Sequence, residues 1–328
     1  MSRDPAFTHG EGVANGVGHS VARQGGLAQT LGEARFVDDM RVLGMLHGAM
    51  VPAEHPRGRV LKIHTDVARA MPGVVRVLTA ADVPGSRGTG LNSPDQPVFV
   101  AEGEVTCCVA DFLAMVVADT FEQARAAASL IDVKYSETDG AFDLSKVKGQ
   151  AETVDKANGQ PGKTSVGNFD QAFTDSPIQL DETYTTPDQS HSMMEPHATI
   201  AWWEGEKLSL WTSNQMVEWG KNDVAKTLKI SPDNVHLKSP YIGGGFGGKL
   251  FVRSDAILAA LGAKAVNRPV KVALQRPLIF NNTTHRPATI QRIRIGTQED
   301  GKITAIAHES WSGNLKGGSP ETAVFQTR

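Results

Sequence analysis

The chain has 328 residues, of which 40% are hydrophobic and 21% charged, and its formal net charge is −3. At about 150 residues per domain, this length predicts two domains. The small negative charge provides no basic field that would attract nucleic acid or anionic lipid. Apolar runs stay far below the ~20 residues of a membrane-spanning helix, and the first 20 residues lack the apolar stretch of a secretory signal peptide. These features predict a globular protein without membrane insertion.

The first part of the sequence divides into a leader and a mixed domain. Residues 1–30 are rich in glycine and lack hydrophobic periodicity, which predicts an extended leader. Short apolar strand patterns and two helix patterns then fill residues 31–140 and predict a compact α+β domain. The expected strands cover residues 34–37, 45–51, 59–63, 74–78, 112–117 and 131–135, and the expected helices cover residues 65–70 and 120–130.

Cys107 and Cys108 are the two cysteines of the chain, and they are adjacent. Adjacent cysteines seldom form a useful disulfide, and two thiols cannot hold an iron–sulfur cluster or a structural zinc ion. We expect both to be apolar strand residues. Any electron-transfer centre would then have to reside on another chain.

A polar segment separates this domain from a second one. Residues 141–177 have little apolar content and predict a linker or surface loop. Strand patterns return at residue 178 and predict a second domain over residues 178–328. Its expected strands cover residues 178–185, 198–203, 207–212, 235–237 and 270–274, and its expected helices cover residues 216–228 and 250–266.

The most informative segment is glycine-rich and lies between an expected strand and an expected helix. Five of the six residues from Gly243 to Gly248 are glycine, with Phe246 as the exception, and Lys249 follows. Glycine removes side-chain bulk and admits positive φ, so successive backbone N–H groups can converge on an anion. The segment predicts a loop that binds a phosphate, a pyrophosphate or a metal-bound oxo group.

Two general nucleotide motifs fit these letters but not their context. Gly243, Gly245 and Gly248 satisfy G-x-G-x-x-G, yet the next strand ends in Arg276 rather than in an acidic ribose ligand, so this pattern allows at best an NADP-binding dehydrogenase. The G-x-x-x-x-G-K pattern is also present. Leu250 then replaces the Ser or Thr that binds Mg²⁺, which argues against a P-loop NTPase.

The glycine run becomes more specific in combination with Trp211–Gln215. Together, the two segments resemble the molybdenum-binding large subunit of the xanthine oxidase family of molybdenum hydroxylases. Residues 185–328 are similar to the large subunit of periplasmic aldehyde oxidoreductases, and residues 31–140 resemble the family's a/b hammerhead domain. The best-matching runs are Gly32–Asp39, Met71–Val74, Thr79–Pro84, Asp188–His191, Met194–His197, Tyr241–Leu250 and Asn281–Pro287.

This resemblance implies an α+β fold, in which an a/b hammerhead domain is followed by the first part of a molybdopterin-binding domain that is incomplete at its C-terminus. It implies that Phe246 and Gly247 lie at the molybdenum, that Gly244 and Gly245 shape the loop, and that Gln215 donates a hydrogen bond to the oxo region. Gln215 and Phe246 are the expected catalytic residues. The pterin supplies the sulfur ligands, so no protein side chain is expected to bind the metal.

The same resemblance implies oxidation of an aldehyde to a carboxylic acid, with water as the oxygen source. Leu250 occupies a position where purine-oxidising members have an acid, and it suits an apolar aldehyde. The implied cofactor is molybdopterin with molybdenum, in the cytosine dinucleotide form. An iron–sulfur small subunit and an FAD-binding medium subunit are the implied partners, in an exported periplasmic complex or in the cytoplasm.

The family's catalytic Glu and substrate-orienting Arg belong to segments that would follow Arg328. A non-catalytic fragment or assembly module that binds the pterin and partner subunits is therefore an alternative, and the NADP-binding dehydrogenase domain is a weaker one. His191, Glu195 and His197 have a spacing that could place three ligands on one face of a strand. We favour a packing role for them.

Overall fold

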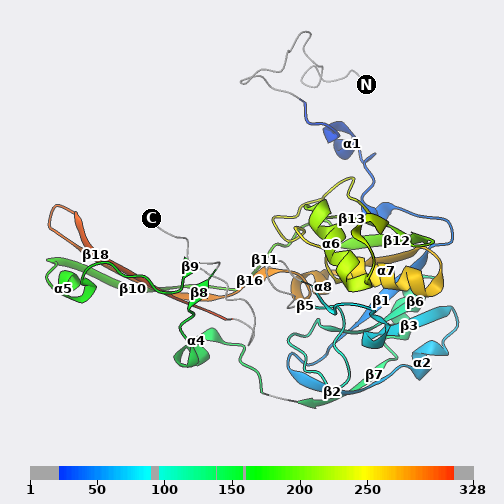
Figure 1. Cartoon of the computed structure of the whole chain (residues 1–328), viewed down its shortest axis with the longest axis horizontal. Helices are drawn as coiled ribbons and strands as arrows, with labels where there is room; N and C mark the ends of the chain where they lie inside the picture. Colours follow the sequence, from blue (N-terminus) through cyan, green and yellow to red (C-terminus); the bar gives the residue numbers. More distant parts are fainter. Residues whose placement is uncertain (1–21, 90–95, 138, 158–159, 314–328) are drawn as a thin grey trace, which may run out of the picture.

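A computed structural model of the chain describes residues 22–89, 96–137, 139–157 and 160–313. Its main body is a mixed seven-stranded sheet with the order β14-β13-β12-β15-β1-β6-β3. Figure 1 shows this sheet with helices packed against it. The strands are β1 (Leu46–Pro52), β3 (Val74–Thr79), β6 (Phe112–Ala118), β12 (Ala198–Glu204), β13 (Lys207–Thr212), β14 (Val235–Lys238) and β15 (Val270–Ala273).

The two halves of the chain share this sheet. Leu46 and Gly48 of β1 pair in parallel with Val270 and Val272 of β15, more than 200 residues later in the sequence. The mixed α+β class is confirmed, and strands from residues 31–140 pair with strands of the second half of the chain. Because β1 lies between β15 and β6, its backbone N–H and C=O groups have partners on both edges.

Two hydrophobic cores lie on opposite faces of the sheet. Along β1, Leu46 and Met50 belong to one core, whereas Ala49 and Val51 belong to the other, as expected from the alternation of side chains in a strand. The first core is covered by α7 (Ser254–Val266) and α6 (Val217–Leu228), and the second by α2 (Asp66–Arg69) and α3 (Phe121–Ala128). Residues 254–263 of α7 are all buried, so α7 is the central helix of the fold.

Three sequence predictions in the first half need correction. Residues 34–37 do not form a strand: η2 (Val37–Asp39) is a 3₁₀ turn, and the carboxylate of Asp39 accepts the N–H of Phe36 at 3.1 Å. Cys107 and Cys108 lie in a turn before β6, where both of their N–H groups donate to Asp111. Residues 1–21 of the expected leader lie outside the described residues, and α1 (Gly26–Thr30) is a short helix within its last part.

The expected linker contains regular structure. Within residues 141–177 lie α4 (Leu144–Val147), η4 (Lys148–Gln150), the strands β8 (Lys156–Ala157) and β9 (Gln160–Pro161), and α5 (Phe169–Thr174). Asp143 caps α4 and Asn168 caps α5, each by accepting a backbone N–H through its side chain. These local caps explain why short helices form in a polar segment.

A second sheet extends away from the main body (Figure 1). It contains β10 (Ile178–Thr186), β17 (Thr289–Thr297) and β18 (Ile303–Ser312), paired antiparallel in that order. The remaining elements are β2 (Gly58–His64), β7 (Asp132–Glu137), η3 (Ala80–Asp82), β4 (Gly88–Thr89), β5 (Gln96–Pro97), β11 (Gln189–Ser190), η5 (Pro232–Asn234), α8 (Arg276–Asn281) and β16 (His285–Arg286).

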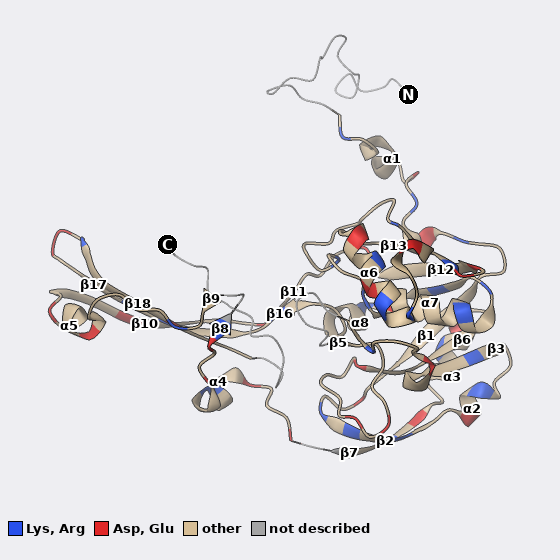
Figure 2. Cartoon of the chain, viewed as in Figure 1, with Lys and Arg blue, Asp and Glu red and all other residues tan. Residues whose placement is uncertain are grey.

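Charges of both signs are distributed over the main body (Figure 2), in agreement with the small net charge of the sequence. Within the described part of the chain, no helix has the length and apolar character needed to cross a membrane.

Candidate functional site

The glycine loop follows β14 and bends sharply at Phe246. Gly244 and Gly247 have φ angles of 93° and 95°, and Phe246 itself has a φ of 49°. The N–H of Gly248 donates to the carbonyl oxygen of Gly245 at 2.6 Å, which closes a tight turn. A non-glycine residue rarely adopts this left-handed conformation. The bend presents the Phe246 side chain to the surface, where it is 75% exposed.

The other three glycines are required because neighbouring side chains approach the backbone closely. A Cβ on Gly243 would lie 2.6 Å from Cβ of Glu195, and one on Gly248 would lie 2.9 Å from Cε of Met193. A Cβ on Gly245 would lie 2.5 Å from Oε1 of Gln215. The five glycines therefore serve two purposes, positive φ at two positions and close packing at three.

A buried carboxylate holds the start and the end of the loop together. Oε2 of Glu195 accepts the N–H of Gly243, the hydroxyl of Ser213 and the ammonium of Lys249, each at 2.7 Å. The Lys249 side chain is 0% exposed. Burial lowers the pKa of Lys249, an effect that the hydrogen bond and charge of Glu195 oppose.

This ion pair removes Lys249 from any role at the surface. In a P-loop the corresponding Lys extends to bound phosphates. Here its Nζ donates to the carboxylate and to the main-chain carbonyl of Glu195, the latter at 3.2 Å. The geometry therefore agrees with the argument from Leu250 against a P-loop NTPase.

The segment after β13 lies directly against the loop. The N–H of Gln215 donates to the carbonyl oxygen of Lys249 at 2.7 Å, and Oε1 of Gln215 accepts the N–H of Lys249 at 3.3 Å. Nδ2 of Asn214 donates to the same Lys249 carbonyl at 3.2 Å. Because Oε1 of Gln215 accepts within the protein, its amide nitrogen is the group available to donate to an outside oxygen. The structure thus brings Gln215 against the loop formed by Gly244, Gly245, Phe246 and Gly247.

His191, Glu195 and His197 do not converge on a common point. The ring of His191 contacts the carbonyl oxygen of Thr284 at 3.0 Å, and Nε2 of His197 contacts that of Gly248 at 3.4 Å. Burial lowers the pKa of His197 to about 3, with smaller contributions from the charges of Lys249 and Arg253. In the described ranges, no group of three or more His, Cys, Asp or Glu side chains is arranged to hold a metal ion.

The surroundings of the loop also differ from a dinucleotide fold. α7 begins at Ser254, later than the expected residue 250, so the loop does not form its N-terminus. Asp255 lies in the first turn of α7, and burial raises its pKa to about 6. β14 and β15 are separated by β13 and β12 in the sheet, whereas a dinucleotide-binding unit places its two strands side by side.

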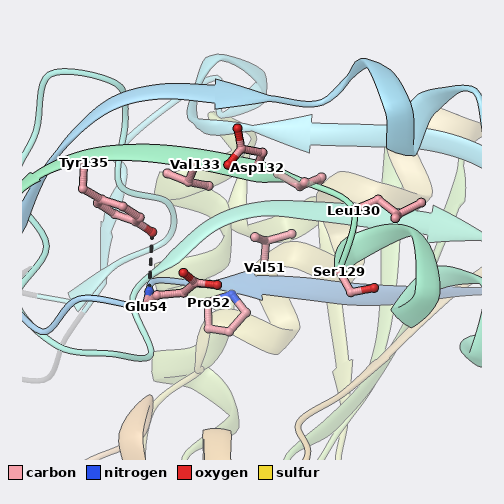
Figure 3. A pocket seen from close by; sticks show the side chains of 9 residues that line it. Val51, Pro52, Glu54, Ser129, Leu130, Asp132, Val133 and Tyr135 are labelled. Carbon is pink, nitrogen blue, oxygen red and sulfur yellow. Dashed lines mark hydrogen bonds between the residues drawn. The ribbon is translucent and has the colours of Figure 1, made fainter.

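A separate cavity lies in the first half of the chain. It lies between β1, β7 and the residues that follow α3 (Figure 3), and its volume is about 240 Å³. The N–H of Glu54 donates to the hydroxyl of Tyr135 at its edge, at 3.4 Å. Its lining contains no residue of the glycine loop.

Two domain families match the chain. Residues 151–326 match the molybdopterin cofactor-binding domain, and residues 31–139 match the a/b hammerhead domain of aldehyde oxidase and xanthine dehydrogenase. The glycine loop and Gln215 lie within the first match, whereas the cavity of Figure 3 lies within the second.

Longer proteins resemble the chain over most of its length. It is 50% identical over 313 residues to the aldehyde oxidoreductase molybdenum-binding subunit PaoC of Escherichia coli, which covers 95% of this chain and 42% of that protein. It is 30% identical over 300 residues to a xanthine dehydrogenase of Oryza sativa, covering 88% and 21%. The crystal structure of quinoline 2-oxidoreductase from Pseudomonas putida matches with a TM-score of 0.79 and 28% identity, covering 89% and 39%. The chain therefore spans less than half the length of these relatives.

Proposed function

Because this chain belongs to the xanthine oxidase family, with the molybdopterin cofactor-binding domain and the a/b hammerhead domain of that family, we propose that it is the molybdenum-binding part of an aldehyde oxidoreductase. The reaction converts an aldehyde and water into a carboxylic acid, two protons and two electrons. The 50% identity to a subunit of that name supports this activity. The glycine loop, packed on Gln215, is the observation that carries the proposal.

The residues of the loop fit a molybdenum cofactor. The Gln215 amide lies where a Cβ on Gly245 would be, so the loop backbone and this amide are in direct contact. Preorganised donors of this kind stabilise negative charge on an oxygen without reorganising during the reaction. We assign the binding surface to Gln215, Gly244, Gly245, Phe246 and Gly247. When bound, the cofactor supplies the oxygen transfer and accepts the electrons.

Other chains complete the electron path in this proposal. The two cysteines of the sequence are too few for an iron–sulfur cluster, and burial with the nearby Asp111 raises the pKa of Cys108 to about 12. We propose that iron–sulfur and FAD-binding subunits receive the electrons, as the family resemblance implies. The resemblance to exported aldehyde oxidoreductases supports the cytosine dinucleotide form of the pterin and a periplasmic location. Leu250, half-buried beside Gly247, suits an apolar aldehyde.

Gln215→Ala tests the role of the amide. The backbone bond from Gln215 to Lys249 is retained, but the bond from the Lys249 N–H to Oε1 is lost, so we expect a small drop in the melting temperature, corresponding to about 1 kcal/mol. Loss of one positioned donor should lower aldehyde turnover by about 10²-fold or more. Gln150→Ala, at an exposed position of η4, is the matched control and should turn over normally. Unaltered kinetics in Gln215→Ala would remove this side chain from the site.

Gly245→Ala tests the packing of the loop against the amide. The new Cβ would lie 2.5 Å from Oε1 of Gln215 and must displace it, which should cost about 1–3 kcal/mol and lower the molybdenum bound per chain. Gly149→Ala is the control, because a Cβ at Gly149 has no heavy atom within 4 Å. Elemental analysis and thermal unfolding measure the two effects. A Gly245→Ala protein with full molybdenum content would contradict the assigned binding surface.

A further inference from the structure

The second sheet has two different faces. Residues that pair directly across antiparallel strands share a face. Leu180 of β10 pairs with Ile295 of β17, and Ile295 pairs with Ile306 of β18. The row on one side adds Ile178 and Ile303 across Thr297, and the row on the other side adds Ile293 between Glu182 and His308. We name this surface the isoleucine face, and it consists of Ile178, Leu180, Ile293, Ile295, Ile303 and Ile306.

The opposite face has most of the charged side chains of the sheet and is partly covered by this chain. The guanidinium of Arg294 lies 4.6 Å from the ring of Phe169 in α5, and Nε2 of Gln179 donates to the carbonyl oxygen of Thr174 at 3.2 Å. Nζ of Lys148 lies 3.9 Å from the ring of Trp311. α5 and η4 therefore pack on the polar face and leave the isoleucine face open.

The isoleucine face is exposed to solvent. Its side chains are 51% exposed at Ile178, 41% at Leu180, 57% at Ile303 and 58% at Ile306. A half-solvated antiparallel sheet normally turns its apolar side chains to the core and its polar ones to water. In this sheet, most of the charged side chains lie on the covered face instead, and the isoleucine face is turned to solvent. A contiguous apolar surface of this kind marks an interaction site.

Charge on the same face favours a polypeptide partner over a membrane. The row next to Leu180 contains Glu182, Ile293 and His308, and the basic residues Arg292 and Arg294 lie on the opposite face. Surfaces that bind anionic lipid carry Lys and Arg beside their apolar residues. The rows that contain the isoleucine face have no Lys or Arg among the described residues, and their one acidic side chain is Glu182.

The lengths of the relatives point to the polypeptide that would cover the isoleucine face. The chain matches 42% of the Escherichia coli subunit and 39% of the Pseudomonas putida structure, so each relative has more than half of its length outside the match. The sheet projects from the main body (Figure 1), and no described element covers the isoleucine face. We propose that this face is the docking surface for the polypeptide that corresponds to the unmatched part of these relatives. This inference does not depend on the proposed activity.

The test compares the 328-residue chain alone with a chimera in which it replaces the matched region of the Escherichia coli subunit. Leu180→Lys and Ile306→Lys are made in both proteins. In the chain alone we expect no change in melting temperature, because both side chains are exposed. In the chimera the new ammonium would be buried without a partner, and soluble yield should fall about tenfold. Thr183→Lys, exposed on the opposite face of β10, should change neither protein.

Three outcomes would overturn the proposal. The first is a chimera that tolerates Leu180→Lys and Ile306→Lys as well as Thr183→Lys. The second is a chain that elutes alone as a dimer and becomes monomeric with Leu180→Lys, since the occupant would then be a second copy. The third is a parent chimera that is insoluble although the chain alone is folded, because the face would then not accept the remainder of the relative.

Discussion

Replacing Lys249 with Met is expected to destabilise the folded chain by about 3–5 kcal/mol. The substitution leaves the carboxylate of Glu195 buried at 8% exposure, without the cation that lies 2.7 Å away. Gly243 and Ser213 still donate to it, but neutral donors do not compensate a buried charge. The double variant Lys249→Met/Glu195→Gln removes both charges and should recover most of the loss. Urea unfolding of the three proteins measures these free energies.

Lys271→Met is the matched control for this prediction. Lys271 is also buried, but its partner Asp38 is 48% exposed and remains solvated when the cation is lost. We therefore expect that losing this ion pair lowers the free energy of unfolding by at most about 1 kcal/mol, in addition to the cost of the altered packing. A Lys249→Met protein as stable as the parent, or a double variant no better than the single one, would show that the Glu195–Lys249 pair does not hold the loop.

Lowering the pH is expected to destabilise the chain through His197. Burial lowers the pKa of this imidazole from 6.5 to about 3, because the charged form would lie in the core beside Lys249 and Arg253. The unfolded chain therefore takes up the proton first, and stability that is complete above pH 6.5 is lost as the pH falls towards 3. Full loss amounts to roughly 5 kcal/mol. Denaturant unfolding between pH 3.5 and 7.5 measures it.

His197→Gln separates this effect from other titrations. Its amide nitrogen can still donate to the carbonyl oxygen of Gly248, as Nε2 of His197 does, but it does not titrate. The difference in unfolding free energy between parent and variant should therefore shrink or reverse as the pH falls. His308→Gln, at an exposed position of β18, should follow the parent at every pH. If the unfolding free energies of His197→Gln and the parent changed with pH in the same way, this would contradict the burial of a neutral imidazole.

Local patterns predicted most of the elements near the loop. The expected helix at residues 216–228 corresponds to α6, and the expected strands at 198–203 and 207–212 correspond to β12 and β13. These segments have periodic apolar residues and clear turn signals, so local sequence suffices. The start of α7 is wrong by four residues because it depends on tertiary packing of residues 250–253, which are buried or half-buried in an irregular conformation.

Long-range pairing could not be predicted in this way. The parallel ladder between β1 and β15 joins segments more than 200 residues apart, and nothing in either segment specifies the other. The ion pair of Lys249 could not be predicted for the same reason, because its partner Glu195 lies on a different segment of the chain. A lysine directly after a glycine run suggests an anion ligand, and only the fold shows that it is fully buried in an ion pair. His191, Glu195 and His197 have a spacing that suggests metal ligands, and of these Glu195 holds the loop together.

The most direct test of the assigned cofactor surface is the amount of molybdenum and pterin bound per chain. It is measured by elemental analysis and pterin fluorescence on the chain purified as part of its complete native complex. We expect one molybdenum and one pterin per chain, with both amounts lowered in parallel by Gly245→Ala and unaffected by Gly149→Ala. A folded, complete complex that binds neither molybdenum nor pterin would contradict the assignment of the glycine loop and Gln215 as the cofactor site.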